Sequence, residues 1–141
     1  MLLHGYARMQ EGSLAEAVAA LSRASILNPE EIDAWNLLGE AQRILGRPEQ
    51  AVRTLQHAIS IDPSSPIVHF LLGEAYRDLG NFVLALAAYA EAVRLEPTQA
   101  PAWYGMGTVL IRTGRKEELA KVMQTLHTLD GNLAKRLALL Q

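Results

Sequence analysis

The sequence predicts an all-α protein built from about four repeats of two helices each, and two observations carry this prediction. The first is a period of 34 residues that recurs along almost the whole chain. The second is the helical spacing of apolar residues in both halves of each period, with a glycine between the halves. A two-helix unit of this size cannot bury its apolar face alone, so the units are expected to stack into a solenoid.

Four ladders of residues share the period. Two are glycine ladders, one at Gly5, Gly39, Gly73 and Gly107 and the other at Gly12, Gly46, Gly80 and Gly114. The third consists of Ala17, Ala51, Ala85 and then Leu119, and the fourth of Pro29, Pro63, Pro97 and then Gly131. This agreement predicts one solenoid domain over residues 1–141, with repeats at about 1–31, 32–65, 66–99 and 100–132.

The helices of each repeat have recognisable starts. Second helices begin at Ser13, which forms a capping box with Glu16, at Pro48 in a first helical turn, and at Asn81 as a cap. Their apolar faces are Ala17, Leu21 and Ala24, then Ala51, Leu55 and Ala58, then Ala85, Tyr89 and Ala92. First helices carry Trp35, Leu38 and Gly39, then His69, Leu72, Gly73 and Tyr76, then Trp103, Met106, Gly107 and Leu110.

The two ends depart from the pattern. Met1 falls inside the first helix of the first repeat, so either the chain begins abruptly or more repeats precede it. Residues 133–141 are expected to form a capping helix in which Lys135 and Arg136 face water. Its leucines either cover the last helix pair or dock a further repeat, and they are Leu133, Leu137 and Leu140.

In order and spacing, seven residues resemble the tetratricopeptide repeat consensus: Trp35, Leu38, Gly39, Ala51, Leu55, Ala58 and Pro63. The resemblance covers nearly the entire chain. It implies antiparallel helix pairs stacked in a right-handed superhelix, with the first helices lining a concave groove. It also implies that the chain binds other proteins.

Composition excludes several other roles. Thirteen Lys and Arg against fifteen Asp and Glu give a net charge of −2, which offers no attraction to nucleic acid or anionic membranes and opposes an RNA-binding solenoid. No apolar run approaches the ~20 residues that span a bilayer. Because the start also lacks a signal peptide, we expect a cytoplasmic protein, although an upstream targeting segment could be missing.

The sequence offers no catalytic or metal-binding constellation. Cysteine is absent, and no two of the four histidines have the i, i+4 spacing of a metal pair. His69 stands where neighbouring repeats have tryptophan, so it is expected to be a packing residue. The glycines form no phosphate-binding loop. We therefore predict a protein that is not an enzyme and holds no metal or cofactor.

The resemblance places eleven residues in the partner-binding groove: Tyr6, Asn36, Glu40, Arg43, Phe70, Glu74, Arg77, Tyr104, Thr108, Ile111 and Arg112. The aromatic rings are expected to be exposed anchors. Glu40 with Arg43, and Glu74 with Arg77, form two pairs at i, i+3 spacing. Either each pair is neutral within its own helix, or the two arginines donate to an acidic or C-terminal peptide. The Lys and Asn clamp of chaperone-binding members is missing.

The predicted function is a protein-interaction scaffold that binds a partner peptide or helix in its concave groove. Two alternatives stay open. The chain could be the substrate-recruiting repeat portion of a longer enzyme, or it could form homo-oligomers through its terminal helices.

Overall fold

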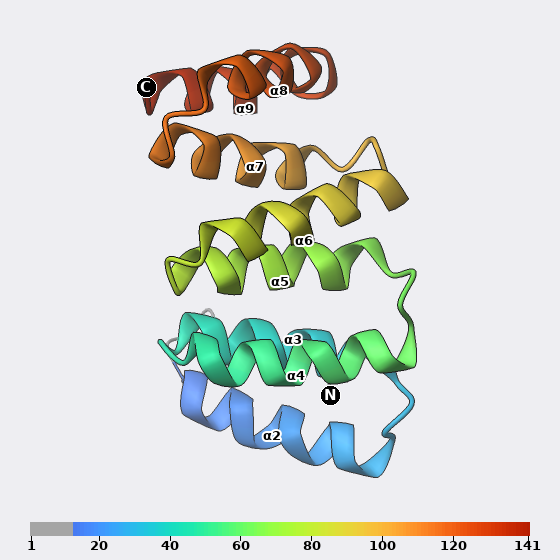
Figure 1. Ribbon diagram of the computed structural model, residues 1–141. Coiled ribbons are helices and arrows are strands. Elements are labelled where there is room, and N and C mark those ends of the chain that lie inside the picture. Colours follow the sequence, from blue (N-terminus) through green and yellow to red (C-terminus); the bar gives the residue numbers. More distant parts are fainter. Residues whose placement is uncertain (1–12) are drawn as a thin grey trace.

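The computed structural model describes residues 13–141, and within this range the backbone forms α-helices without strands. The helices stack in chain order, from α2 at one end to α8 and α9 at the other (Figure 1). Their bounds are α2 Leu14–Leu27, α3 Ile32–Ile44, α4 Pro48–Ile61, α5 Pro66–Asp78, α6 Phe82–Leu95, α7 Ala100–Arg112, α8 Lys116–Leu129 and α9 Gly131–Leu139. The predicted all-α solenoid is confirmed. The expectations for Gly5, Tyr6 and Gly12 lie outside the described residues.

A glycine in the left-handed region turns the chain from each first helix into the second. Gly46, Gly80 and Gly114 have φ of 86°, 76° and 69°. An added Cβ would meet nothing within 4 Å at these positions, so the backbone conformation is what requires glycine. The next residue closes the helix, as where Arg47 N donates to Gln42 O. One glycine ladder of the sequence therefore marks the turns within repeats.

A ring nitrogen ties each first helix to the turn that precedes it. It donates to the carbonyl oxygen of the proline six residues earlier: Trp35 to Pro29 at 2.8 Å, His69 to Pro63 at 2.9 Å, and Trp103 to Pro97 at 2.8 Å. For His69 this contact requires the proton on Nε2, because a carbonyl only accepts. His69 therefore makes the same hydrogen bond as the two tryptophans at its position in the repeat.

The first helices form the inner side of the stack. α3 contacts α5 and α5 contacts α7, whereas α4 does not contact α6 and α6 does not contact α8. A stack whose first helices lie closer together than its second helices curves toward the first helices. The residues that α3, α5 and α7 turn away from the second helices therefore face a common inner surface.

The other glycine ladder allows close approach between helices. A Cβ on Gly39 would lie 2.7 Å from the side chain of Leu55, and one on Gly73 would lie 2.7 Å from the ring of Tyr89. Each contact joins a first helix to the second helix of the same repeat. In the last repeat the corresponding contact of Gly107 is with Leu137 of α9.

The helix starts agree with the sequence in part. α4 begins at Pro48, and the Asn81 side chain accepts from Leu84 N at 3.3 Å, as expected. Ser13 does precede α2, but its side chain makes no capping hydrogen bond. α9 begins at Gly131, two residues before the expected start, because the Asp130 side chain caps it by accepting from the amides of Asn132 and Leu133.

The capping helix buries fewer of its leucines than expected. Leu137 is fully buried and Ala134 is 5% exposed, and both belong to the core that α7, α8 and α9 share. Leu140 is 52% exposed, so the expectation that it covers the last helix pair is wrong. It follows the last turn of α9, where the helix has already ended.

Candidate functional site

Ten of the eleven residues predicted for the groove lie on the inner helices, and Tyr6 lies outside the described part of the chain. α3 contributes Asn36, Glu40 and Arg43, α5 contributes Phe70, Glu74 and Arg77, and α7 contributes Tyr104, Thr108, Ile111 and Arg112. Within each helix the spacing of three and four residues keeps these positions on one face. The three faces adjoin because α5 contacts both α3 and α7.

Five of these residues surround one pocket of about 450 Å³ at the α9 end of the inner surface. Arg77 of α5 forms one wall, and Leu140, just after α9, forms another. α7 supplies the rest of the lining with Tyr104, Thr108, Ile111 and Arg112. The pocket thus combines a ring, aliphatic carbon, a hydroxyl and two guanidinium groups.

Three of the predicted groove residues are less accessible than expected. Asn36 is only 7% exposed, so the expectation that it lines an accessible groove is wrong for this residue. Phe70 is half-buried and packs against the hydrophobic core, with its ring 6.1 Å from that of Tyr89. Tyr104 is also half-buried and packs against the last core cluster. These rings therefore do not form the fully exposed aromatic patch that the sequence led us to expect.

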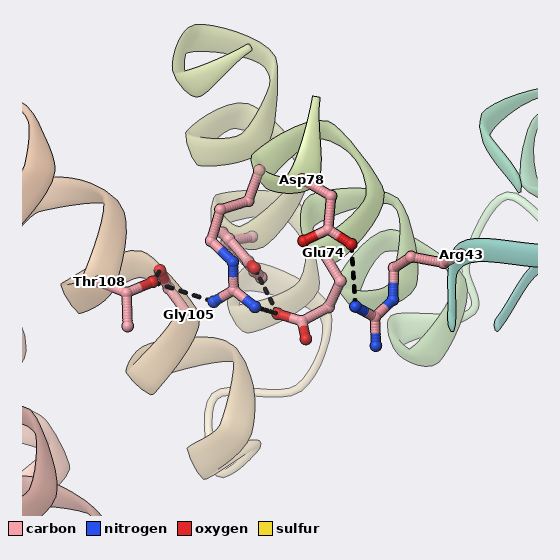
Figure 2. A network of polar contacts seen from close by, with 7 residues as sticks. Arg43, Glu74, Asp78, Gly105 and Thr108 are labelled. Carbon is pink, nitrogen blue, oxygen red and sulfur yellow. Dashed lines mark hydrogen bonds and ion pairs between the residues drawn. The ribbon is translucent and has the colours of Figure 1, made fainter. Parts of the chain in front are cut away.

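A chain of polar contacts crosses the inner helices beside the pocket (Figure 2). The Tyr89 hydroxyl donates to Glu74, whose carboxylate also pairs with Arg77 at 3.1 Å. Arg77 donates in addition to Thr108 Oγ1 at 3.0 Å, and Thr108 donates to Gly105 O at 2.7 Å. Contacts to both α5 and α7 hold the Arg77 side chain in place at the pocket wall.

The network depends on a tyrosine that the sequence analysis treated only as part of an apolar face. Tyr89 occupies the place that Leu55 and Leu21 have in other repeats, and it is fully buried. Gly105 stands where the preceding repeat has Leu71, and a Cβ on it would lie 2.5 Å from the Tyr89 ring. The missing side chain makes room for the longer ring, so the phenol reaches Glu74. The signal available in the sequence was that Tyr89 and Gly105 differ in size from the residues at the same repeat positions, Leu55 and Leu71.

Burial is the main cause of a raised pKa at Tyr89. Removal of the phenol from water disfavours the phenolate, and the negative charge of Glu74 acts in the same direction. The nearby guanidinium of Arg77 opposes the shift but does not cancel it. The hydroxyl therefore keeps its proton at neutral pH and acts as a fixed donor to Glu74.

The two predicted Glu and Arg pairs have different outcomes. Glu74 pairs with Arg77 within α5, which agrees with the alternative that each pair is neutral within its own helix. Arg43 instead pairs with Asp78 of the next repeat at 3.0 Å, so the expected pairing with Glu40 is wrong. Both arginines named as free donors therefore already have a carboxylate partner within the chain.

Two other arginines near the pocket have only aromatic partners among residues 13–141. The Arg112 guanidinium lies over the Phe82 ring, 5.4 Å from its centroid. Arg136 of α9 lies over the Tyr104 ring at 5.6 Å. Neither has a carboxylate within ion-pair distance in this range. Arg136 was expected only to face water, and its place beside the pocket follows from the packing of α9.

In the described residues no group of three His, Asp or Glu side chains is placed to hold a metal ion. None of the described helices is both long and apolar enough to cross a membrane.

Comparisons with known proteins agree with the architecture. Solved structures of MamA share the fold: "Crystal structure of MamA" is 20% identical with a TM-score of 0.81, covering 90% of this chain and 74% of that one. "MamA 41-end from Desulfovibrio magneticus RS-1" is 20% identical with a TM-score of 0.82, covering 93% and 74%. No curated protein matches the sequence.

Models of repeat families match most of the chain directly. A model described as "Tetratricopeptide repeat" matches residues 2–66, and one described as "TPR repeat" matches residues 73–114. The helix pairs, the turn glycines and the inner surface of first helices are what such repeats build. The chain therefore belongs to the tetratricopeptide repeat family and, in general terms, is a protein-interaction scaffold.

Proposed function

We propose that the chain binds a segment of a partner protein along the inner face of α3, α5 and α7, with one side chain of the partner anchored in the pocket beside α9. The observation that carries this proposal is the meeting of Arg77, Tyr104, Thr108 and Arg112 around one cavity. A cavity of about 450 Å³ lies within the usual size range of ligand sites.

The pocket wall is ordered before a partner arrives. Arg77 is held by Glu74 and Thr108, and Glu74 is held by the buried Tyr89. A partner that binds such a surface loses less conformational freedom in the receptor side chains than one that must order them. This favours selective binding of a short segment.

A second candidate surface lies on the outer side of the stack. Val83 and Leu84 of α6 are 80% and 43% exposed. The repeat positions that hold Val83, Leu84, Ala87 and Ala90 in α6 hold Glu49, Gln50, Arg53 and Gln56 in α4. An exposed apolar strip at positions that are polar in another repeat is a recognised mark of an interaction surface.

Affinity capture from lysate with two matched variants separates the two surfaces. Thr108→Trp fills the inner pocket, and Val83→Glu places a charge on the outer strip without touching the groove. We expect a partner that wild type and Val83→Glu retain and Thr108→Trp loses, confirmed by direct titration with that partner once purified. Loss only with Val83→Glu would move the site to α6, and equal capture by all three proteins would contradict groove binding.

Both variants need a check of fold and mass. Circular dichroism and thermal melting must show an intact helical stack for the capture results to report on binding. Sedimentation equilibrium tests the homo-oligomer alternative at the same time, because self-association gives a mass that rises with concentration.

A further inference from the structure

We infer that the pocket beside α9 accepts an acidic side chain that is flanked by an apolar residue in the partner segment. This inference rests on the proposed function and names the chemistry of the ligand. It follows from the balance of charge around the pocket and from what the remaining lining offers.

Near the pocket, positive side chains outnumber negative ones once the side chains that form ion pairs with each other are set aside. Glu74 is neutralised by Arg77 and receives the Tyr89 proton donor as well. Asp78 is neutralised by Arg43. Arg112 and Arg136 have no carboxylate partner within residues 13–141, so two positive charges stay uncompensated at this end of the groove.

The aromatic contacts leave these two arginines available to a ligand. A guanidinium that stacks over a ring uses its face, while its N–H groups lie in the guanidinium plane and keep their hydrogen-bonding capacity. The guanidinium carbons of Arg112 and Arg136 lie 5.4 and 5.6 Å from the centroids of the Phe82 and Tyr104 rings, and neither contact occupies an N–H group with a carboxylate. Carboxylates accept such N–H groups in short, charge-assisted hydrogen bonds.

Apolar contact is the second part of the recognition. Tyr104, Ile111 and Leu140 line the same pocket as Arg112. Leu140 is 52% exposed, so burial of its side chain by a ligand would remove apolar surface from water. An apolar residue next to the acidic one in the partner would make this contact.

Acidic and basic side chains are unevenly distributed along the inner surface. Glu40, toward the other end of the inner surface, has no ion-pair partner within the described range. The inner surface is thus more positive at its α9 end, and the acidic part of a partner segment should bind there.

The test uses three capped dipeptides as probes and the full chain labelled for NMR. Acetyl-Leu-Asp-amide is compared with its neutral isostere acetyl-Leu-Asn-amide and with acetyl-Leu-phosphoserine-amide. We expect the Asp probe to shift the methyl signals of Thr108 and Ile111 and the Arg112 Nε–H signal, and to bind about tenfold more tightly than the Asn probe, as one charge-assisted hydrogen bond predicts.

Two arginine variants provide the matched control. Arg112→Gln should remove most of the preference for Asp over Asn, whereas Arg53→Gln, on the outer helix α4, should leave it unchanged. Equal affinity for the Asp and Asn probes, no shift of the pocket signals, or an unchanged preference in Arg112→Gln would overturn the inference. Tighter binding of the phosphoserine probe would overturn the assignment of a carboxylate.

Capture experiments distinguish a failure of this inference from a failure of the proposed function. A captured partner that is lost with Thr108→Trp but kept with the double variant Arg112→Gln/Arg136→Gln would retain the groove and reject the acidic anchor. A partner that neither change affects would reject the groove itself.

Discussion

At the residue scale, the most informative feature is the pairing of one large residue with one missing side chain. Tyr89 is longer than the leucines at the same position of other repeats, and Gly105 is smaller than Leu71. Each departure alone would disturb the packing. Together they bring a buried phenol to Glu74, which pairs with Arg77 of the pocket wall.

This pairing predicts that the effect of Gly105→Ala on the free energy of unfolding changes sign when Tyr89 is replaced by leucine. Gly105→Ala should destabilise the wild-type protein by about 1 to 3 kcal/mol, because the new Cβ would lie 2.5 Å from the Tyr89 ring. In the Tyr89→Leu background the same change should stabilise the protein by up to about 1 kcal/mol, since alanine is the better helix former once the ring is gone. Urea unfolding measures both steps.

The cycle contains its own control. Tyr89→Leu reports the loss of the ring and its hydrogen bond, and the two Gly105 steps are compared only with each other. An equal effect of Gly105→Ala in the two backgrounds would show that the ring and the glycine are not coupled.

At the element scale, α9 positions Leu140, which forms the second wall of the pocket. The Asp130 side chain accepts from the amides of Asn132 and Leu133 at 3.1 and 3.2 Å, which starts the helix. Leu137 then packs against Gly107 of α7 and is fully buried. These two attachments place Arg136 over Tyr104 and Leu140 at the pocket.

Removal of the cap should loosen this element. We expect Asp130→Ala to lower the free energy of unfolding by about 1 kcal/mol, the usual cost of a lost N-cap. Ser13→Ala is the comparison, because the Ser13 side chain makes no capping hydrogen bond, and its effect should stay below about 0.5 kcal/mol. Thermal or urea unfolding checks both, and equal losses would mean that the Asp130 contacts do not stabilise α9.

At the scale of the whole molecule, the stack is held together by contacts between neighbours. Each described helix contacts its neighbours in chain order, and the first helices add contacts to one another along the inner side. Three of the core clusters accordingly follow one another along the described chain, around Leu72, Tyr89 and Leu126. Stability in such a stack is approximately a sum of local terms, and the ends are free to open separately.

Two leucine-to-alanine substitutions that create similar cavities should therefore destabilise different numbers of helices. Leu126→Ala in α8 and Leu72→Ala in α5 both remove a buried leucine and should cost about 2 to 5 kcal/mol of local stability. By hydrogen exchange with mass spectrometry, Leu126→Ala should deprotect α7, α8 and α9 while α3 and α4 keep their protection. Leu72→Ala should deprotect helices on both sides of α5. Uniform deprotection in both variants would instead indicate one cooperative unit.

Much of this architecture was predictable from the sequence because it depends on local chemistry. The period located the helix pairs, and the glycines at 46, 80 and 114 located the turns because those backbones need positive φ. Pro48 and Asn81 started helices where expected, since these signals act within one turn. His69 kept the hydrogen bond of its tryptophan counterparts because the partner carbonyl lies six residues away.

What the tertiary structure alone decided concerns partners distant in sequence. Arg43 pairs with Asp78, 35 residues away, and not with Glu40 of its own helix, because the approach of α3 to α5 brings the two charges together. Tyr89 reaches Glu74 of the neighbouring helix past Gly105, and α9 folds back on α7 so that Leu140 lines the pocket. The sequence by itself determined the repeat, its turns and the chemistry available on the inner helices. The curvature of the stack determined which of those charges neutralise one another and which stay free, because such contacts depend on distances between helices and not on spacing within them.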